Sequence, residues 1–188
     1  MCYSPGFGKR CFCLVTLWEQ AVRNELSGDY AVRNRTLYHG SKQGVWYPEI
    51  RVTRFHSDFY FGFYCTESRE QAIRQATRFE GIGVLNEYKF EMRGTLSVLQ
   101  FPQMSEEWLD FVTACRSGVS HSYDIVEGPM ADDQIFNYVQ NYLDGKITRA
   151  AFWELARFKR PTHQMSFHSA RALACLQFVR EVEVTDEV

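Results

Sequence analysis

The sequence predicts an α+β domain, and two observations lead to this prediction. Short aromatic or alternating segments, typical of strands, occur among longer segments whose apolar residues recur at helical spacing. These strand and helix signals follow one another irregularly, which argues against a doubly wound parallel sheet. A length of 188 residues suits one domain with a substantial core.

The predicted strands are short and bounded by glycine, proline or polar residues. We expect them at 36–39, 59–65, 85–92, 96–98, 123–126 and 164–167. The first strand is expected to end at Gly40, and Gly128-Pro129 is expected to form a turn that closes the fifth. The segment 44–54 contains Pro48 and is predicted as an irregular connection.

The predicted helices begin at residues that typically cap a helix N-terminus. The expected starts are Ser68, Ser105, Asp132 or Asp133, Thr148 and Ser169. Apolar residues at helical spacing follow each start, and the expected buried faces include Leu155, Phe158 and, in the last helix, Leu176.

Residues 1–35 are predicted to be an N-terminal extension, either packed on the domain or regulatory, with a helix over 16–24. Residues 36–182 are predicted to form the domain itself. The apolar stretch 11–18 is too short for a secretory signal and has no small-residue cleavage site. No run approaches the ~20 apolar residues of a membrane span. We therefore expect a cytoplasmic protein with no membrane partner.

Composition limits the classes of function. A formal net charge of -2 gives no broad positive field for nucleic acid, although a local basic groove remains compatible with it. Most of the cysteines lie in apolar segments, which favours buried free thiols in a reducing compartment over disulfides. Cys11 and Cys13 are too close together for a zinc knuckle, and His163 and His168 have no partner cluster, so we expect no metal.

Two motifs carry the chemistry. The first is Leu37-Tyr38-His39-Gly40-Ser41 at a strand end, and the second spans 58–66, with Gly62-Phe63-Tyr64 leading towards a helix. A histidine and a small hydroxyl can bind ribose hydroxyls, a glycine lets a carboxamide approach the backbone, and an aromatic ring can stack on a base.

These motifs, with three further segments, resemble the His-Tyr-Glu branch of the ADP-ribosyltransferase superfamily, and more closely the bacterial family of unknown function DUF3990. The further segments are Gln71-Ala72 in a helix, 124–133, and 164–167 before the last helix. The resemblance implies split antiparallel sheets with flanking helices. It also implies that NAD is a substrate, cleaved through an oxocarbenium-like cation.

The resemblance assigns roles to individual residues. His39 would bind a ribose hydroxyl or orient the nicotinamide half, Gly40 would offer its backbone to the carboxamide, and Ser41 would support that contact. Tyr64 would stack on the nicotinamide ring, and Gly62, two residues before it, would also belong to the cofactor-binding residues. Taken without the resemblance, His39 reads as a turn residue and Tyr64 as core packing.

Gln164 falls at the third motif position, where many transferases have a glutamate that stabilises the cation. An amide accepts the same hydrogen bond without charge, which would cost a factor on the order of 10²–10³ in rate. The auxiliary acids that we expect nearby are Glu127, Asp132 and Asp133. The simpler reading of the two aspartates is a helix N-cap, and Gln164 can also be an ordinary edge-strand residue.

A second departure is Tyr60-Phe61, where the family pattern has a glycine and a basic residue. Two aromatic rings at this place can stack on the base of a nucleic-acid target, or they can belong to the core. The sequence does not separate these alternatives.

The function expected from the resemblance is that of an NAD-dependent mono-ADP-ribosyltransferase, a glycosyltransferase. Small enzymes of this kind act as toxins or phage-defence effectors, so an antitoxin is an expected partner. The acceptor is either RNA or DNA, or a protein. The alternatives are a weak or inactive module that binds NAD or ADP-ribose, and an NAD glycohydrolase.

Overall fold

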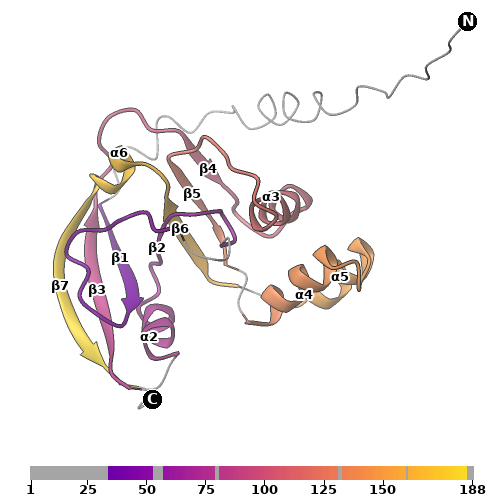
Figure 1. The fold of residues 1–188 in the computed structure, drawn as a ribbon, viewed down its shortest axis with the longest axis horizontal. Helices are drawn as coiled ribbons and strands as arrows, with labels where there is room; N and C mark the ends of the chain where they lie inside the picture. Colours follow the sequence, from indigo (N-terminus) through magenta and orange to yellow (C-terminus); the bar gives the residue numbers. More distant parts are fainter. Residues whose placement is uncertain (1–33, 53–56, 79–80, 131–132, 160, 186–188) are drawn as a thin grey trace, which may run out of the picture.

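The structure is a computed structural model that describes residues 34–52, 57–78, 81–130, 133–159 and 161–185. Within these residues the chain forms a mixed α/β fold of two sheets and five helices (Figure 1). The three-stranded sheet has the order β1 (Arg35–Ser41), β3 (Gly83–Phe90), β7 (Leu176–Val184). The four-stranded sheet has the order β2 (Phe63–Cys65), β6 (His163–Phe167), β5 (Ile125–Pro129), β4 (Val98–Gln100).

The helices begin where the capping residues predict. They are α2 (Arg69–Thr77), α3 (Glu106–Arg116), α4 (Asp133–Leu143), α5 (Arg149–Ala156) and α6 (Ala170–Leu173). The side chains of Ser68, Ser105, Thr148 and Ser169 each accept a hydrogen bond from the backbone N–H three residues later, which confirms these four N-caps. Within the described residues no helix combines the length and apolar character needed to cross a membrane.

The two sheets meet at one point. Tyr38 on β1 and Thr66, just after β2, form an isolated antiparallel bridge, with N···O distances of 2.8 and 2.9 Å. β1 pairs with β3 along its whole length, Arg35–Ser41, whereas β2 pairs with β6. The middle of β1 and the end of β2 therefore lie side by side where the two sheets meet, and this junction positions the candidate site.

One strand pair corrects the expectation of purely antiparallel sheets. β4 pairs with β5 in parallel, because the chain crosses over through α3 between them. The remaining strand pairs are antiparallel.

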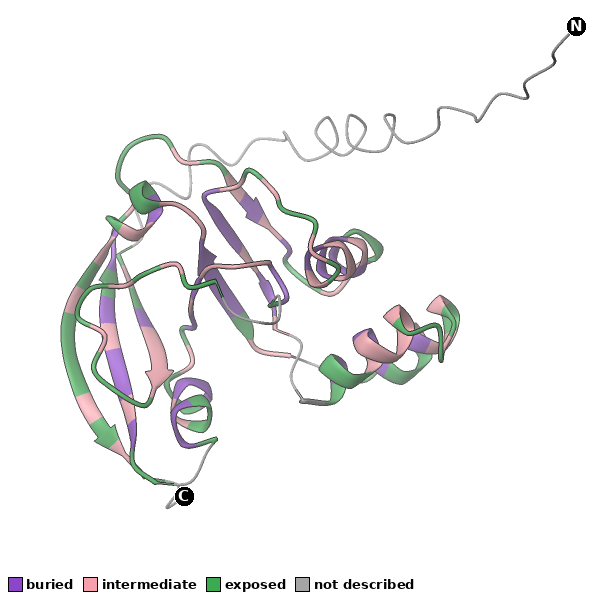
Figure 2. Ribbon diagram, viewed as in Figure 1, coloured by how far each residue is buried: buried purple, intermediate pink, exposed green. Residues whose placement is uncertain are grey.

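The core has two parts, one on each face of the four-stranded sheet. Under α3, Trp108 and Val112 are fully buried against Phe59 and Val126. On the opposite face a second cluster fills the space between the two sheets, and it includes Leu37, Phe63, Tyr88, Met165 and Phe167. Figure 2 shows that the four-stranded sheet is largely buried, whereas much of β7 is exposed.

Several predicted elements differ from those observed. The second strand starts only at Phe63, because the chain before it turns through Tyr60 at a positive φ of 70°. Gly128 and Pro129 do not form a closing turn; they continue β5 and pair with Gln164 and His163. The reason is local, since an apolar run followed by glycine and proline fits a strand end as well as a turn.

The C-terminal region also differs. The last helix ends at Leu173, and Leu176 opens a strand that the sequence analysis missed, pairing along the whole of β3. The predicted face of α5 is wrong in part, because Leu155 is 45% exposed and Phe158, beyond the helix end, is 83% exposed. The predicted extension 1–35 lies outside the described residues except for Asn34 and Arg35, and Arg35 already belongs to β1.

Candidate functional site

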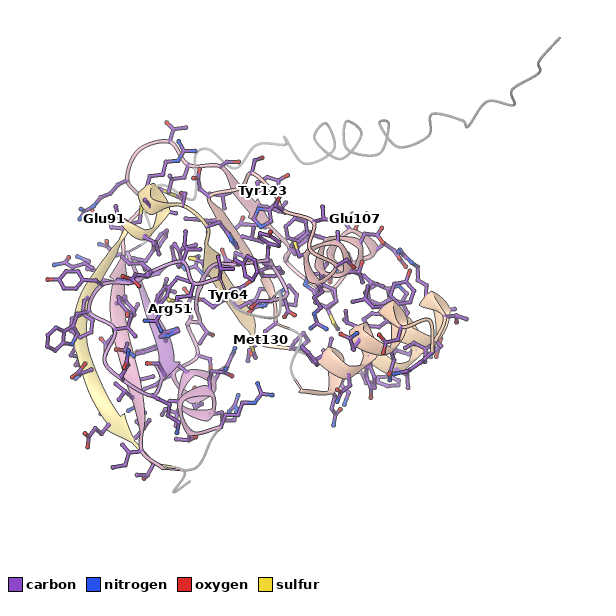
Figure 3. The ribbon with its side chains drawn as sticks, in the orientation of Figure 1. Arg51, Tyr64, Glu91, Glu107, Tyr123 and Met130 are labelled. Atoms are coloured by element: carbon purple, nitrogen blue, oxygen red, sulfur yellow. The ribbon has the colours of Figure 1, made fainter. Side chains whose placement is uncertain are left out.

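His39 lies on β1 at the junction of the two sheets. Its Nδ1 is 2.7 Å from the carbonyl oxygen of Tyr64 on β2. A carbonyl only accepts, so Nδ1 carries the proton and Nε2 has a lone pair. Burial lowers the pKa of His39, and the positive charge of Arg51 lowers it further. The imidazole is therefore neutral at pH 7 and offers Nε2 as a hydrogen-bond acceptor. Arg51 and Tyr64 are labelled in Figure 3.

A buried asparagine fixes the backbone around His39. Asn86 on β3 donates from Nδ2 to the His39 carbonyl at 3.2 Å and to Ser41 Oγ at 2.9 Å. Its Oδ1 accepts from the Val45 amide at 2.7 Å, which ties the following loop to the same point. Ser41 Oγ in turn donates to the Gln43 carbonyl at 2.6 Å. Ser41 thus supports the local backbone.

Gly40 has a packing reason to be glycine. A Cβ at this position would lie 1.9 Å from the carbonyl oxygen of Ala72 and 2.7 Å from the amide nitrogen of Ala76, both in the backbone of α2. The helix therefore covers this side of β1 closely. The absence of a side chain at Gly40 is required by α2, independently of any ligand.

Tyr64 lies on β2 with its ring partly buried against the core under α3. Its hydroxyl donates to the carbonyl of Tyr60 at 2.6 Å and accepts from the amide of Phe59 at 3.1 Å. Burial raises the pKa of Tyr64 well above its ordinary value, so this hydroxyl keeps its proton. Tyr64 thus holds the turn that precedes its own strand.

Two histidines hold the neighbouring carbonyls of that turn. His121 Nε2 lies 3.1 Å from the Phe59 carbonyl, and His168 Nδ1 lies 2.8 Å from the Phe61 carbonyl. Gly62 leaves room for this arrangement, because a Cβ there would lie 2.8 Å from the His168 ring. Together with the Tyr64 contact, side chains from three separate segments bind three consecutive carbonyls. We call residues 57–62 the clamped loop.

Gln164 on β6 is buried, and its side chain points to the face of the sheet that carries Tyr64. Its Nε2 donates to Oδ2 of Asp58 at 3.1 Å. Asp58 Oδ1 accepts from Arg116 at the end of α3, at 3.0 Å from Nε and 2.5 Å from Nη2. The acid that the structure places beside Gln164 is therefore Asp58.

Glu127 lies on the other face of the four-stranded sheet. It pairs with Met165 in the ladder, whereas Gln164 pairs with Gly128, so the side chains of Glu127 and Gln164 point in opposite directions. Glu127 receives two bonds from Arg35 and one from Gln100, at 2.9 Å. Asp132 lies outside the described residues, and Asp133 is the first residue of α4.

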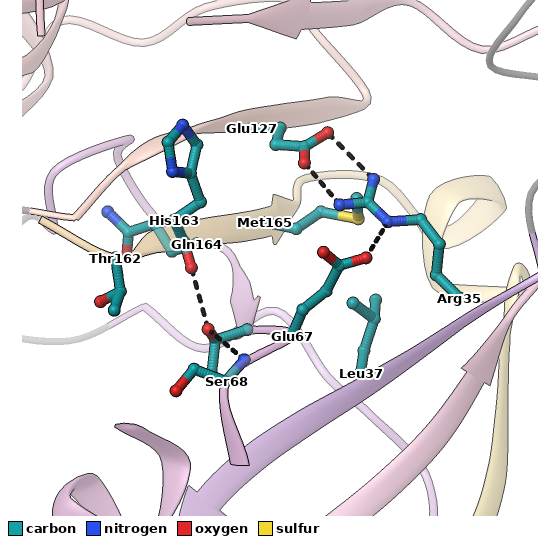
Figure 4. Close-up of a pocket in the computed structure, with 10 residues that line it drawn as sticks. Arg35, Leu37, Glu67, Ser68, Glu127, Thr162, His163, Gln164 and Met165 are labelled. Atoms are coloured by element: carbon teal, nitrogen blue, oxygen red, sulfur yellow. Dashed lines mark hydrogen bonds and ion pairs between the residues drawn. The ribbon is translucent and has the colours of Figure 1, made fainter. Parts of the chain in front are cut away.

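Figure 4 shows the cavity beside the Arg35–Glu127 pair. Leu37, Ser68 and Gln164 contribute to its lining, and its volume is ≈ 190 Å³. Small-molecule pockets usually measure about 300–1,000 Å³, so this cavity is too small for a whole dinucleotide. A larger hollow of ≈ 650 Å³ beside Trp46 and Phe178 is lined mainly by apolar residues. It lacks the converging polar groups found at the His39 junction.

Three cysteines lie among the described residues. Cys65, Cys115 and Cys175 are buried and free, as predicted for these three. Burial raises the pKa of Cys65 well above its ordinary value and that of Cys115 to about 12. Among the described residues, no group of three or more His, Cys, Asp or Glu side chains is placed to hold a metal ion.

The structure brings His39, Tyr64 and Gln164 to adjoining strands, and it adds residues that the sequence analysis missed. Asp58 begins the second motif, 58–66, but the sequence assigns it no role, although an acid is expected near Gln164. Arg116 and Asn86 gave no usable signal, because a basic residue at a helix end and a polar residue in a strand are common.

Two comparisons with known proteins bear on identity. No curated protein matches the chain significantly. A family model described as "Protein of unknown function (DUF3990)" matches residues 35–178, a range that contains His39, Tyr64 and Gln164. This range covers most of the chain and agrees with the family that the motifs resemble. The chain therefore belongs to the DUF3990 family.

Proposed function

We propose that the protein is an NAD-dependent mono-ADP-ribosyltransferase of the His-Tyr-Glu/Gln type. One observation carries the proposal: the neutral ring of His39 is bonded to Tyr64, and Tyr64 and Gln164 share one face of paired strands. Both side chains also bond to the clamped loop, at Tyr60 and at Asp58. The bond from His39 is to the backbone carbonyl of Tyr64, so three residues from distant parts of the chain are connected through β2 and its pairing with β6.

The proposed reaction uses these groups in the following way. His39 Nε2 accepts a ribose hydroxyl, the backbone beside Gly40 binds the carboxamide, and the Tyr64 ring packs on the nicotinamide. The bond between nicotinamide and ribose breaks with its electron pair going to the nicotinamide nitrogen. Gln164 Oε1 accepts a ribose hydroxyl as positive charge develops on the sugar. The acceptor's nucleophile then bonds to the same ribose carbon and loses its proton.

The acceptor is a nucleic-acid base or a protein side chain. Tyr60 and Phe61, whose ring centroids are 4.7 Å apart, lie beside the constellation and give an aromatic surface for the acceptor. The proposal includes a role as a toxin or phage-defence effector, held inactive by an antitoxin. It also includes a cytoplasmic location, where NAD is abundant.

The test uses the full-length protein, NAD labelled on the adenylate phosphate, and cell extract. The expected result is release of nicotinamide and transfer of label to a macromolecule; digestion with nuclease or protease then identifies the acceptor class. His39→Ala and Tyr64→Ala should each abolish transfer. Tyr47→Ala is the matched control, because Tyr47 is an aromatic residue that is 85% exposed. Absence of nicotinamide release from the wild type would exclude the enzyme.

A second candidate is a module that binds NAD or ADP-ribose without turnover. The charge arrangement favours it: the position expected to carry a carboxylate holds Gln164, and the nearby Asp58 is neutralised by Arg116. Calorimetry that detects NAD binding, without nicotinamide release in any extract, would support this module. An NAD glycohydrolase, the third alternative, would give free ADP-ribose as its sole labelled product.

A further inference from the structure

The surroundings of Gln164 fix which way its amide points. Asp58 has a carboxylate, which accepts hydrogen bonds and does not donate them, so only the NH₂ group of Gln164 can face it. The amide oxygen must then point away from Asp58. Within the part of the chain that the structure describes, Gln164 Oε1 has no hydrogen-bonding partner and is not a buried unsatisfied atom. It is therefore available to a ligand as an acceptor.

Asp58 is itself held from two sides. The guanidinium of Arg116 binds Oδ1 and leaves Oδ2 to Gln164, and the side chains of Arg116 and Asp58 are only 4% and 9% exposed. The backbone that carries Asp58 belongs to the clamped loop, whose carbonyls are bound by Tyr64, His121 and His168. The carboxylate therefore has little freedom to turn away from the amide.

We infer that Asp58 is a positioning residue that orients Gln164, so that the amide oxygen and not the NH₂ group meets a ribose hydroxyl of NAD. This inference rests on the proposed function. Asp58 and Gln164 then act as one unit in place of the single glutamate that related enzymes carry. A hydrogen bond to a carboxylate also polarises the amide, which makes its oxygen a stronger acceptor.

The same geometry explains why position 164 holds an amide. A glutamate there would place a second carboxylate about 3 Å from Asp58, and repulsion between two ionised carboxylates at that distance would keep a proton on the pair to higher pH. One proton would be shared between them, as in other carboxylate pairs. Glutamine gives the acceptor oxygen without this repulsion.

The test compares three variants: Asp58→Asn, Gln164→Glu and the double variant D58N/Q164E. The double variant exchanges the positions of the amide and the carboxylate, so that Arg116 keeps a negative partner nearby and the fold is preserved. The rate of nicotinamide release is measured at saturating and limiting NAD from pH 5 to 9. Thermal midpoints are recorded for the same proteins.

The expected kinetic signature is specific. Asp58→Asn allows the amide to turn, and we expect kcat to fall about 10- to 100-fold, more than KM rises. Gln164→Glu should gain a titration in its kcat profile, with activity falling as pH rises and the shared proton is lost. The double variant should lose that titration and exceed both single variants in kcat.

Other groups near Asp58 do not produce this signature. Tyr64 on β2 and Cys115 on α3 face Asp58, and the pKa of each is raised by burial, so both remain protonated over the pH range of the assay. Arg116 stays charged throughout. Gln100→Glu is the matched control, because Gln100 also donates to an arginine-bound carboxylate, Glu127, on the other face of the sheet. It should affect stability without adding a titration to kcat.

The inference and the proposed function fail in distinguishable ways. No NAD cleavage by the wild type would overturn the function, and orientation is then tested by NMR of the Gln164 side-chain amide. Its protons should exchange slowly with solvent in the wild type and faster in Asp58→Asn. Unchanged exchange in the folded variant overturns the orientation. If the fold-change in kcat of the double variant equals the product of the two single fold-changes, and its shift in thermal midpoint equals their sum, the coupling of Asp58 to Gln164 is overturned.

Discussion

The four-stranded sheet carries the same polar arrangement on each of its faces: an arginine bound to a carboxylate that accepts from a glutamine amide. On one face these are Arg116, Asp58 and Gln164. On the other they are Arg35, Glu127 and Gln100. We call them the loop triad and the strand triad, because Asp58 lies on the clamped loop whereas the strand triad draws one residue from each of three strands.

The two triads differ in burial and in support. The ionic side chains of the loop triad are 4% and 9% exposed, against 17% and 13% in the strand triad. Arg35 also binds the more exposed Glu67. In the strand triad, regular pairing of β4 and β5 sets Gln100 opposite Glu127. In the loop triad Asp58 does not lie in a paired strand, and the side chains of Tyr64, His121 and His168 hold its loop.

The difference in support indicates which triad serves the stability of the fold and which serves the proposed function. A triad that follows from strand register needs no additional contacts, so its polar groups serve the fold. The loop that carries Asp58 contains Tyr60 at a positive φ and three carbonyls bound by side chains. A left-handed non-glycine residue costs conformational free energy, and such strain is common at functional sites. We therefore propose that the loop triad serves the proposed reaction and that the strand triad serves the fold.

The largest expected effect comes from removing each arginine. Arg116→Met leaves Asp58 buried without a counter-ion, and we expect a loss of about 3–5 kcal/mol in the free energy of unfolding. Arg35→Met should cost less, about 1–2 kcal/mol, because Glu127 keeps its bond from Gln100 and greater access to water. Urea unfolding at pH 7 measures both values. Equal losses would remove the distinction between the triads.

The second prediction concerns pH. Burial lowers the pKa of His168 to about 4, from an ordinary value near 6.5. The unfolded chain then binds a proton that the folded chain rejects, so stability is complete above about pH 6.5 and falls as pH decreases towards 4. The loss from this group approaches about 3 kcal/mol at pH 4.

His168→Asn provides the comparison, because an amide can still donate to the Phe61 carbonyl. Its stability should be lower at pH 7 and should change less between pH 6.5 and 4, as measured by urea unfolding at several pH values. Some slope should remain, since burial also lowers the pKa of His39 and of His121. Tyr88→Phe should keep the full slope, because burial raises the pKa of Tyr88 and it does not titrate in this range. Parallel curves for wild type and His168→Asn would contradict the assignment.

Much of the fold could be predicted from local signals. Capping serines and a threonine located four helices correctly, because an N-cap depends only on residues within one turn. The strand β7 was missed, because Leu176 continues the apolar spacing of the preceding helix and its strand character depends on pairing with β3. The parallel β4–β5 pair was missed for the same reason: pairing partners are tertiary information.

The candidate site was predictable where it coincides with a motif. His39, Tyr64 and Gln164 were named from the sequence, and the structure places them on adjoining strands. Asp58 could not be assigned, since its partner Arg116 is distant in sequence and a loop aspartate usually faces water. Glu127 was named as an auxiliary acid from its place in a motif, but strand alternation turns it to the opposite face. A shift of one residue in strand register moves a side chain to the other face of the sheet, and the sequence alone does not determine the register.

The last prediction tests the clamp that distinguishes the loop triad. Tyr64→Phe removes the hydroxyl that bonds to Phe59 and Tyr60 and keeps the ring, so we expect a loss of about 1–2 kcal/mol in the free energy of unfolding. Tyr88→Phe is the matched control, because its hydroxyl holds another loop through the Val45 carbonyl. Hydrogen exchange at the Phe59 amide should accelerate in Tyr64→Phe and stay unchanged in Tyr88→Phe.

The consequence for the proposed reaction separates two roles of Tyr64. If the ring alone mattered, Tyr64→Phe would keep wild-type kcat, because the stacking surface is retained. Since the hydroxyl also holds the loop that carries Asp58, we expect kcat to fall about threefold to tenfold, with a smaller change in KM. Addition of Tyr64→Phe to Asp58→Asn should then lower kcat little further, because both changes release the same amide. A full multiplicative loss in that double variant would show that the clamp acts on catalysis by a route other than Asp58.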